Sequence, residues 1–308
     1  MTKKSAIENE TISGFTAIYQ NQENMALKRI YKEALKLGEG PVWDYRIQKL
    51  FFVDIMDKKL YIYDYQIQSF EEHVFNEYVS CLALTPDLDI ILISLESGLY
   101  ELEWKTGRKT FITQPEHRSN YRYNDGAVSP WGTWLIGSMN NLNNGDNGPL
   151  LPDATLYELK QDKAKPLLDG VIISNGIVFE DTFIYFIDSE LNSVRRFKYN
   201  DGKLEDETLV FQYDGTGSLD GMCLSRSQKL YIANWGANRI IIFDLARLEV
   251  IDYIPLPSKN PTSCTFGGPN MDELFISSSA HEDDQPDAAG LYCLKIDDDA
   301  AVEFILNH

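Results

Sequence analysis

The strongest constraint on the fold is an internal repeat of 40 to 50 residues that occurs six times along the chain. Each unit begins with a small residue and a short apolar strand, turns, and continues into a second apolar strand that closes on Asp, Asn or Ser. Most units add a third strand rich in Tyr, Leu and Phe. The units start at residues 40, 80, 126, 176, 221 and 263. Short strands repeated at this period are typical of propellers, so we predict an all-β, six-bladed β-propeller.

The repeats also set the domain boundaries. We expect residues 25–308 to form one propeller domain and the polar residues 1–24 to form an N-terminal extension. Residues 25–35 have two interpretations. Their apolar residues recur at near-helical spacing among strong helix formers, which indicates a short helix. Alternatively, the segment is a strand that pairs with the last blade and closes the ring.

Charge and composition narrow the range of partners and compartments. The chain has 28 basic and 47 acidic residues, a formal charge of −19, which argues against a nucleic-acid or anionic-membrane partner. No apolar run reaches the ~7 to 15 residues of a signal peptide or the ~18 to 20 of a membrane span, so we expect a cytoplasmic protein. The four cysteines (Cys81, Cys223, Cys264 and Cys293) are far apart in sequence, and we interpret them as small buried hydrophobic residues.

The position just before each repeat start is the next informative feature. These six positions hold Glu39, Val79, Asp125, Asn175, Asp220 and Thr262. Blades are related by pseudo-rotation, so the four acidic or amide side chains among them are expected to converge at one end of the channel. Converging carboxylates repel one another unless a cation neutralises them, and an oxygen-only set favours calcium, magnesium or manganese, with zinc also possible. The alternative is that Asp-Gly and Asn-Gly here mark ordinary surface turns.

Five short motifs around these positions carry a family resemblance. They are GEGPVW at 38–43, RYNDG at 122–126, SNG at 174–176, DGM at 220–222 and CTFGGP at 264–269. In this order and spacing, the chain resembles the family of senescence marker protein, gluconolactonase and luciferin-regenerating enzyme, and is most similar to its regucalcin-type lactonases. The likeness extends over residues 37–296.

This resemblance implies a six-bladed propeller with one divalent metal ion, for which calcium is our first choice. It implies that Glu39, Asn175 and Asp220 hold the metal, and that Arg122 and Asn124 hydrogen-bond a sugar lactone. Asp125 would lie near the metal without being a firm ligand, and we include it with the substrate-binding residues.

The segment at 140–148 departs from the family pattern. Its Asn- and Gly-rich sequence replaces a stretch that contributes an acidic substrate contact in regucalcin-like members. We expect it to be a lid loop over the channel mouth in which Asn140 or Asn141 touches the substrate. The alternative is a plain surface loop.

The predicted chemistry is hydrolysis of a sugar lactone. A divalent ion would polarise the lactone carbonyl, and Asp220 would act as general base on the attacking water. Arg122 would grip substrate hydroxyl or carboxylate groups through its planar fork, unless it is a solvated loop arginine. The four histidines (His73, His117, His281 and His308) fall in predicted loops or at the terminus, and no Gly-x-Ser-x-Gly motif occurs. This argues against a Ser-His-Asp hydrolase.

Two other functions fit the same predicted site. One is a calcium-centred aryl esterase or phosphotriesterase, and the other is a non-catalytic calcium-binding propeller. Convergent carboxylates beside an arginine favour an enzyme over a scaffold.

Overall fold

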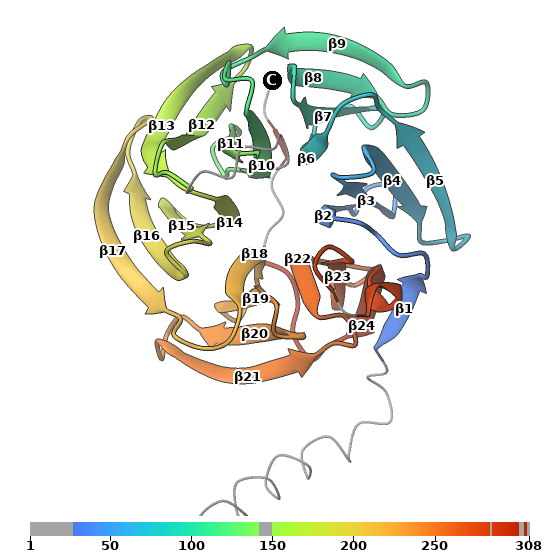
Figure 1. Ribbon diagram of the computed structural model, residues 1–308, viewed down its shortest axis with the longest axis vertical. Helices are drawn as coiled ribbons and strands as arrows, with labels where there is room; N and C mark the ends of the chain where they lie inside the picture. Colours follow the sequence, from blue (N-terminus) through green and yellow to red (C-terminus); the bar gives the residue numbers. More distant parts are fainter. Residues whose placement is uncertain (1–26, 142–149, 284, 302–304, 307–308) are drawn as a thin grey trace, which may run out of the picture.

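Six four-stranded antiparallel sheets, arranged as blades around a central channel, make up the computed structural model (Figure 1). The structure describes residues 27–141, 150–283, 285–301 and 305–306. The predicted all-β, six-bladed β-propeller is therefore confirmed. The predicted extension at 1–24 and most of the predicted lid loop at 140–148 lie outside the described residues.

The predicted repeat starts fall on the strands that surround the channel. These innermost strands are β2 (Gly38–Asp44), β6 (Val79–Leu84), β10 (Tyr121–Val128), β14 (Ser174–Glu180), β18 (Ser218–Leu224) and β22 (Asn260–Gly267). The next strands outward are β3 (Lys49–Asp54), β7 (Ile90–Leu95), β11 (Trp134–Asn140), β15 (Phe183–Asp188), β19 (Lys229–Trp235) and β23 (Glu273–Ser279). The repeat therefore corresponds to one blade.

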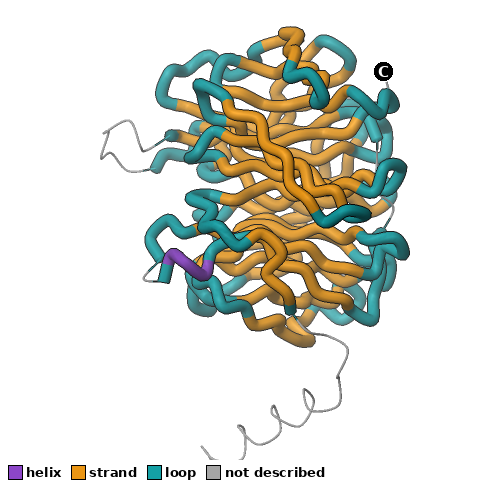
Figure 2. The backbone as a smooth tube through the Cα atoms, turned by 90° about the vertical axis from the view of Figure 1, so that its right-hand side faces the viewer, coloured by secondary structure: helices purple, strands orange, loops and turns teal. Residues whose placement is uncertain are grey.

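The aromatic-rich third strands lie farther from the axis. They are β4 (Lys59–Asp64), β8 (Gly98–Glu103), β12 (Ala154–Lys160), β16 (Ser193–Tyr199), β20 (Arg239–Asp244) and β24 (Leu291–Lys295). The outermost strands are β5 (Ser69–Val74), β9 (Arg108–Thr113), β13 (Lys163–Val171), β17 (Leu204–Gln212), β21 (Glu249–Pro255) and β1 (Lys28–Tyr31). Loops gather at the two ends of the ring (Figure 2).

The ring closes through its first strand. β1 pairs antiparallel with β24, with Lys28 opposite Cys293 and Arg29 opposite Tyr292. The guanidinium of Arg29 also donates hydrogen bonds to the carbonyls of Asp287 and Ala289, next to the short 3-10 turn η3 (Pro286–Ala288). Of the two interpretations of residues 25–35, the closing strand is thus correct and the helix is wrong. The pairing covers the edge of β24, which would otherwise be open.

The core lies between neighbouring blades. β3 and β15 are buried along almost their whole length, whereas the residues of β5 and β17 are all partly or fully exposed to solvent. Aromatic side chains pack against one another across several of the joints between blades. Trp43 stacks on Phe275 with ring centroids 5.5 Å apart, and Phe211 stacks on Phe243 at 4.6 Å. A second strand buried on both faces must be apolar throughout, which explains why the repeats read as continuous hydrophobic runs.

The polar residues that close the second strands are structural. Asp54, Ser94, Ser138, Asp188, Asn234 and Ser277 are fully buried. The Asp54 carboxylate accepts hydrogen bonds from the backbone N–H groups of Lys36 and Leu37, and the Asp188 carboxylate accepts from those of Ile172 and Ile173. These bonds fix the loops that lead into β2 and β14, two of the strands that carry predicted site residues.

The described part of the C-terminal segment contacts two opposite sides of the channel. The N–H of Ala301 donates to the Leu224 carbonyl on β18, and the N–H of Leu306 donates to the Leu84 carbonyl on β6. Both carbonyls lie at the C-terminal ends of their innermost strands, whereas the predicted metal ligands lie near the N-terminal ends of theirs. This segment and the predicted site are therefore at opposite ends of the channel. Among the described residues, no helix has the length and apolar character needed to cross a membrane.

Candidate active site

Every innermost strand departs from regular pairing at the position that the repeats single out. The pairing register shifts between these residues: Glu39 and Val42, Val79 and Leu82, Tyr123 and Gly126, Asn175 and Ile177, Leu219 and Met222, Pro261 and Ser263. Gly40 takes a left-handed backbone with φ +51°, which glycine adopts most readily. Bulge-like shifts re-aim side chains, so the same irregularity recurs around the channel mouth in all six blades.

A cavity of about 350 Å³ at this end of the channel collects all but one of the predicted site residues. Its lining includes Glu39, Arg122, Asn124, Asn141, Asn175 and Asp220. Each of these side chains is at most 8% exposed. The solvated-loop alternative for Arg122 is therefore wrong, since the guanidinium is buried in the cavity wall.

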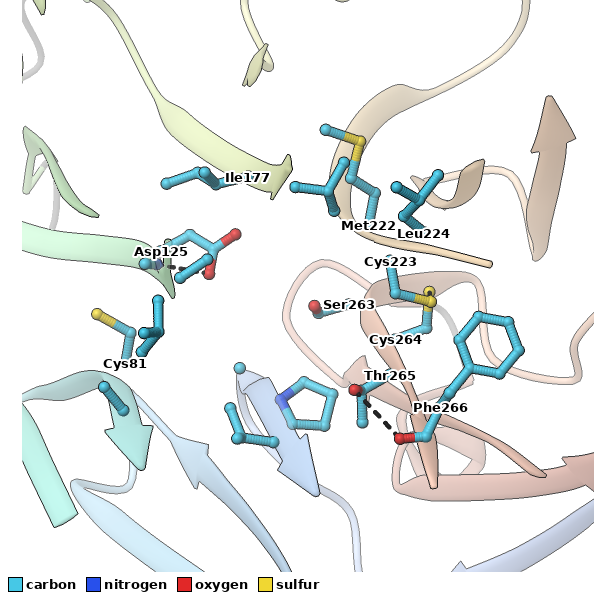
Figure 3. A pocket seen from close by; sticks show the side chains of 18 of the residues that line it. Cys81, Asp125, Ile177, Met222, Cys223, Leu224, Ser263, Cys264, Thr265 and Phe266 are labelled. Carbon is cyan, nitrogen blue, oxygen red and sulfur yellow. Dashed lines mark hydrogen bonds between the residues drawn. The ribbon is translucent and has the colours of Figure 1, made fainter. Parts of the chain in front are cut away.

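Asp125 lies elsewhere. It lines a second cavity of about 180 Å³ farther along the channel, together with Cys81, Cys223 and Cys264 (Figure 3). Its carboxylate accepts a hydrogen bond of 2.7 Å from the N–H of Gly126. The structure therefore separates Asp125 from the other predicted substrate-binding residues, although its charge still acts on Glu39 and Asp220.

A chain of hydrogen bonds orients the amides in the main cavity. Arg122 Nη1 donates to Asn124 Oδ1 at 2.5 Å and to the Tyr123 carbonyl at 2.9 Å. Asn124 Nδ2 donates to Asn175 Oδ1 at 3.0 Å and to the Ser174 carbonyl at 2.7 Å. A guanidinium can only donate, so it fixes which atom of each amide is the oxygen. Asn175 consequently turns its oxygen toward Asn124 and its nitrogen away.

Burial raises the pKa of all three carboxylates, and repulsion between them raises the pKa of Glu39 and Asp220 further. Burial, followed by the charge of Asp125, raises the pKa of Glu39. Burial, followed by the charges of Glu39 and Asp125, raises the pKa of Asp220. Burial also raises the pKa of Asp125 to about 6 and lowers that of Arg122 to about 10. The negative charges of Glu39, Asp125 and Asp220 thus outnumber the positive charge of Arg122 at this site, and this excess favours a bound cation.

The donor atoms fit a hard divalent cation. Among the residues that the structure describes, Asp220 Oδ1 is buried with no hydrogen-bond partner. No group of three or more His, Cys, Asp or Glu side chains is placed to hold a metal ion in the described part of the chain. The predicted set contains only two such residues, because its third member is the amide of Asn175. Carboxylate and amide oxygens are the donors that calcium and magnesium prefer, so the residues present suit such an ion.

Several residues of this cavity were not predicted from the sequence. Ser189, which bonds the amide nitrogen of Asn175 at 2.7 Å, directly follows the closing residue of β15. Trp235, at the corresponding end of β19, also lines the cavity, as do His281 and Glu282. His281 does lie in a loop, but that loop forms part of the cavity wall. His73 lies on β5, so its predicted position in a loop is wrong.

Comparisons with known proteins agree with this architecture. The family model described as "SMP-30/Gluconolactonase/LRE-like region" matches residues 37–280. Regucalcin of Gallus gallus is 30% identical over 286 residues, covering 87% of this chain and 94% of the relative. A Bacillus subtilis protein named "Putative sugar lactone lactonase YvrE" is 27% identical over 274 residues, covering 85% and 91%. The solved structure of an Agrobacterium tumefaciens regucalcin, described as a calcium-binding protein, has a TM-score of 0.85 at 22% identity and covers 92% of this chain and 98% of its own, which supports the fold.

Proposed function

The chain belongs to the SMP-30/gluconolactonase/LRE-like family, and from this premise we propose that it is a metal-dependent hydrolase that opens a sugar lactone. One observation carries the proposal: a single cavity combines the buried carboxylates of Glu39 and Asp220 and the amide of Asn175 with the buried guanidinium of Arg122. Relatives named for lactonase activity support the choice of reaction.

Glu39, Asn175 and Asp220 would hold the metal ion, with calcium as first choice and zinc, magnesium and manganese as alternatives. When bound, such an ion supplies Lewis-acid polarisation of the lactone carbonyl and stabilises the negative charge that develops on its oxygen. The unpartnered Oδ1 of Asp220 and the oxygen of Asn175, held by its nitrogen's bond to Ser189, support this ligand set.

Asp220 would also accept the proton of the attacking water. Asp220 lines the cavity, and its buried Oδ1 has no hydrogen-bond partner among the described residues, which supports this role. A general base must lie within hydrogen-bonding reach of the proton that it removes, and a carboxylate inside the cavity meets this condition. His281 also lines this cavity and is the control residue for this role.

Arg122 and Asn141 would contact the substrate directly. Nη1 of Arg122 donates hydrogen bonds within the protein, so the other N–H groups of the guanidinium would bind the substrate hydroxyl groups. Asn141 Nδ2 is buried and has no partner among the described residues. Both donors of Asn124 are bonded within the protein, so its contact with the substrate would use its oxygen. A cavity of about 350 Å³ suits a monosaccharide-sized ligand.

The decisive test is hydrolysis of a panel of aldonolactones, including glucono-1,5-lactone, followed by pH-stat. The protein is first stripped with a chelator and then supplied with calcium, magnesium, manganese or zinc. We expect turnover only after a metal is restored. D220A should abolish it, whereas D214A, at an exposed aspartate before β18, and H281A should leave it largely intact.

Other outcomes would favour the alternatives. If a metal binds and raises the melting temperature but no lactone is opened, the proposed metal site is supported and the proposed lactone substrate is wrong. Aryl esters and phosphotriesters would then be assayed, and a purely calcium-binding role would remain if they too are left intact. The cytoplasmic location and the absence of nucleic-acid and membrane partners stay predictions.

A further inference from the structure

Two cysteines from neighbouring blades meet in the wall of the second cavity. Cys223 lies on β18 and Cys264 on β22, and their Sγ atoms are 3.6 Å apart. Figure 3 shows the two sulfur atoms side by side at the edge of the cavity of about 180 Å³. The residues are 41 positions apart in sequence, so the channel brings them together.

The other two cysteines have different surroundings. Cys81 lines the same cavity, but its Sγ lies 3.2 Å from the Ser94 hydroxyl. Cys293 donates its S–H to the Glu273 carboxylate at 3.1 Å. Among the described residues there is no disulfide. The close approach of two sulfur atoms is therefore specific to Cys223 and Cys264.

We propose that Cys223 and Cys264 are a redox-active dithiol whose reversible disulfide ties β18 of the fifth blade to β22 of the sixth. The sulfur atoms need to approach only from 3.6 Å to the ~2.0 Å of a disulfide bond. The proposal does not depend on the function assigned to the main cavity, since it rests on the second cavity alone.

The oxidant would be a small peroxide that enters this cavity. Cys223 is the more exposed of the two thiols, because Cys264 is only 3% exposed. The Cys223 sulfur attacks the peroxide O–O bond, which forms a sulfenic acid and releases water when the oxidant is hydrogen peroxide. The Cys264 sulfur then attacks the sulfenic sulfur, the S–S bond forms and a second water leaves. In total, two thiols lose two electrons and two protons to one peroxide, and an external dithiol reverses the change.

The test uses the folded, full-length chain and maps its thiols. The protein is treated with hydrogen peroxide under native conditions, alkylated, digested and analysed by mass spectrometry. We expect one linked peptide pair containing Cys223 and Cys264, lighter than the two separate peptides by the mass of two hydrogen atoms. Dithiothreitol should remove the link. C81S is the matched control, because Cys81 lines the same cavity and the link should still form without it.

A second measurement asks whether the bond acts on the fold. The disulfide restricts the unfolded chain, so oxidised wild-type protein should melt at a higher temperature than reduced protein. C223S and C264S should show no such rise. The proposal is overturned if Cys223 and Cys264 remain thiols in the folded protein while peroxide modifies other residues, or if they become linked only after denaturation.

Discussion

The side-chain nitrogen of Asn175 donates a hydrogen bond of 2.7 Å to the hydroxyl of Ser189. That hydroxyl donates onward to the Leu219 carbonyl at 2.6 Å, immediately before Asp220 in the chain. One serine thus connects two of the three proposed metal ligands, which belong to different blades. It also fixes the amide of Asn175 with its oxygen away from Ser189.

Removing this hydroxyl is expected to weaken metal binding. In S189A the amide nitrogen of Asn175 loses its partner, and only the hydrogen bond from Asn124 still orients the amide. Residues that orient metal ligands typically contribute about 10- to 100-fold to affinity, so the calcium dissociation constant should rise by about that factor. Isothermal titration of the metal-free protein measures it. S119A, at an exposed serine, is the control, and equal affinities of S189A and wild type would contradict the positioning role.

Arg122 is expected to act mainly on substrate binding. R122M removes the donors of the guanidinium while keeping much of its apolar length. A hydrogen bond to a charged group contributes about 1.5 to 3 kcal/mol, so kcat/KM for the preferred lactone should fall about 10- to 100-fold. Steady-state kinetics checks this, with R226M as control because Arg226 is largely exposed. A kcat/KM for R122M within twofold of wild type would remove Arg122 from the proposed site.

Glu158 links the third and fourth blades and should make stability depend on pH. This buried carboxylate accepts hydrogen bonds from Tyr199 at 2.6 Å and Thr133 at 3.0 Å, and it pairs with Lys165 at 3.2 Å. Burial raises the pKa of Glu158, but the hydrogen bonds from these partners outweigh burial and lower it below the ordinary value. Its contribution is therefore complete above about pH 4.3 and is lost as the pH falls through the pKa of the folded protein.

The variant E158Q tests this contribution. At pH 7 its free energy of unfolding should be about 2 kcal/mol lower than that of wild type, since a charged acceptor is replaced by a neutral amide. Urea denaturation across pH 3 to 8 should show the difference shrinking toward the acid end. E71Q, at an exposed position on β5, should differ little at any pH. A difference for E158Q that is constant with pH would show that the carboxylate charge is not responsible.

The repeat register predicted that Glu39, Asn175 and Asp220 converge, because the blades are related by rotation, and these residues line one cavity. Glu39, Asn175 and Asp220 occupy the same place in three innermost strands, so counting from each repeat start was enough to bring them together. Counting from the repeat starts could not predict that the neighbours Asn124 and Asp125 have different surroundings. These neighbours line different cavities, and the register shift between Tyr123 and Gly126 determines which side chain reaches which cavity.

Other features depend on contacts that local patterns do not contain. Ser189, Trp235 and His281 lie at or beyond the ends of second strands, in connections that the repeat comparison left out. The apolar spacing of residues 25–35 fitted a helix as well as a strand. Only pairing with β24, more than 250 residues later, decides between them. The Cys223–Cys264 pair likewise requires two blades to be placed side by side.

The most direct test of the central claim is a titration of lactone hydrolysis against added metal. Metal-free protein at a concentration well above the dissociation constant receives increasing amounts of the preferred ion while turnover of the preferred lactone is followed. If Glu39, Asn175 and Asp220 hold one ion that the reaction requires, turnover should begin near zero and rise linearly to a plateau at one equivalent per chain. Full turnover by the metal-free protein, with no response to added metal, would contradict the account.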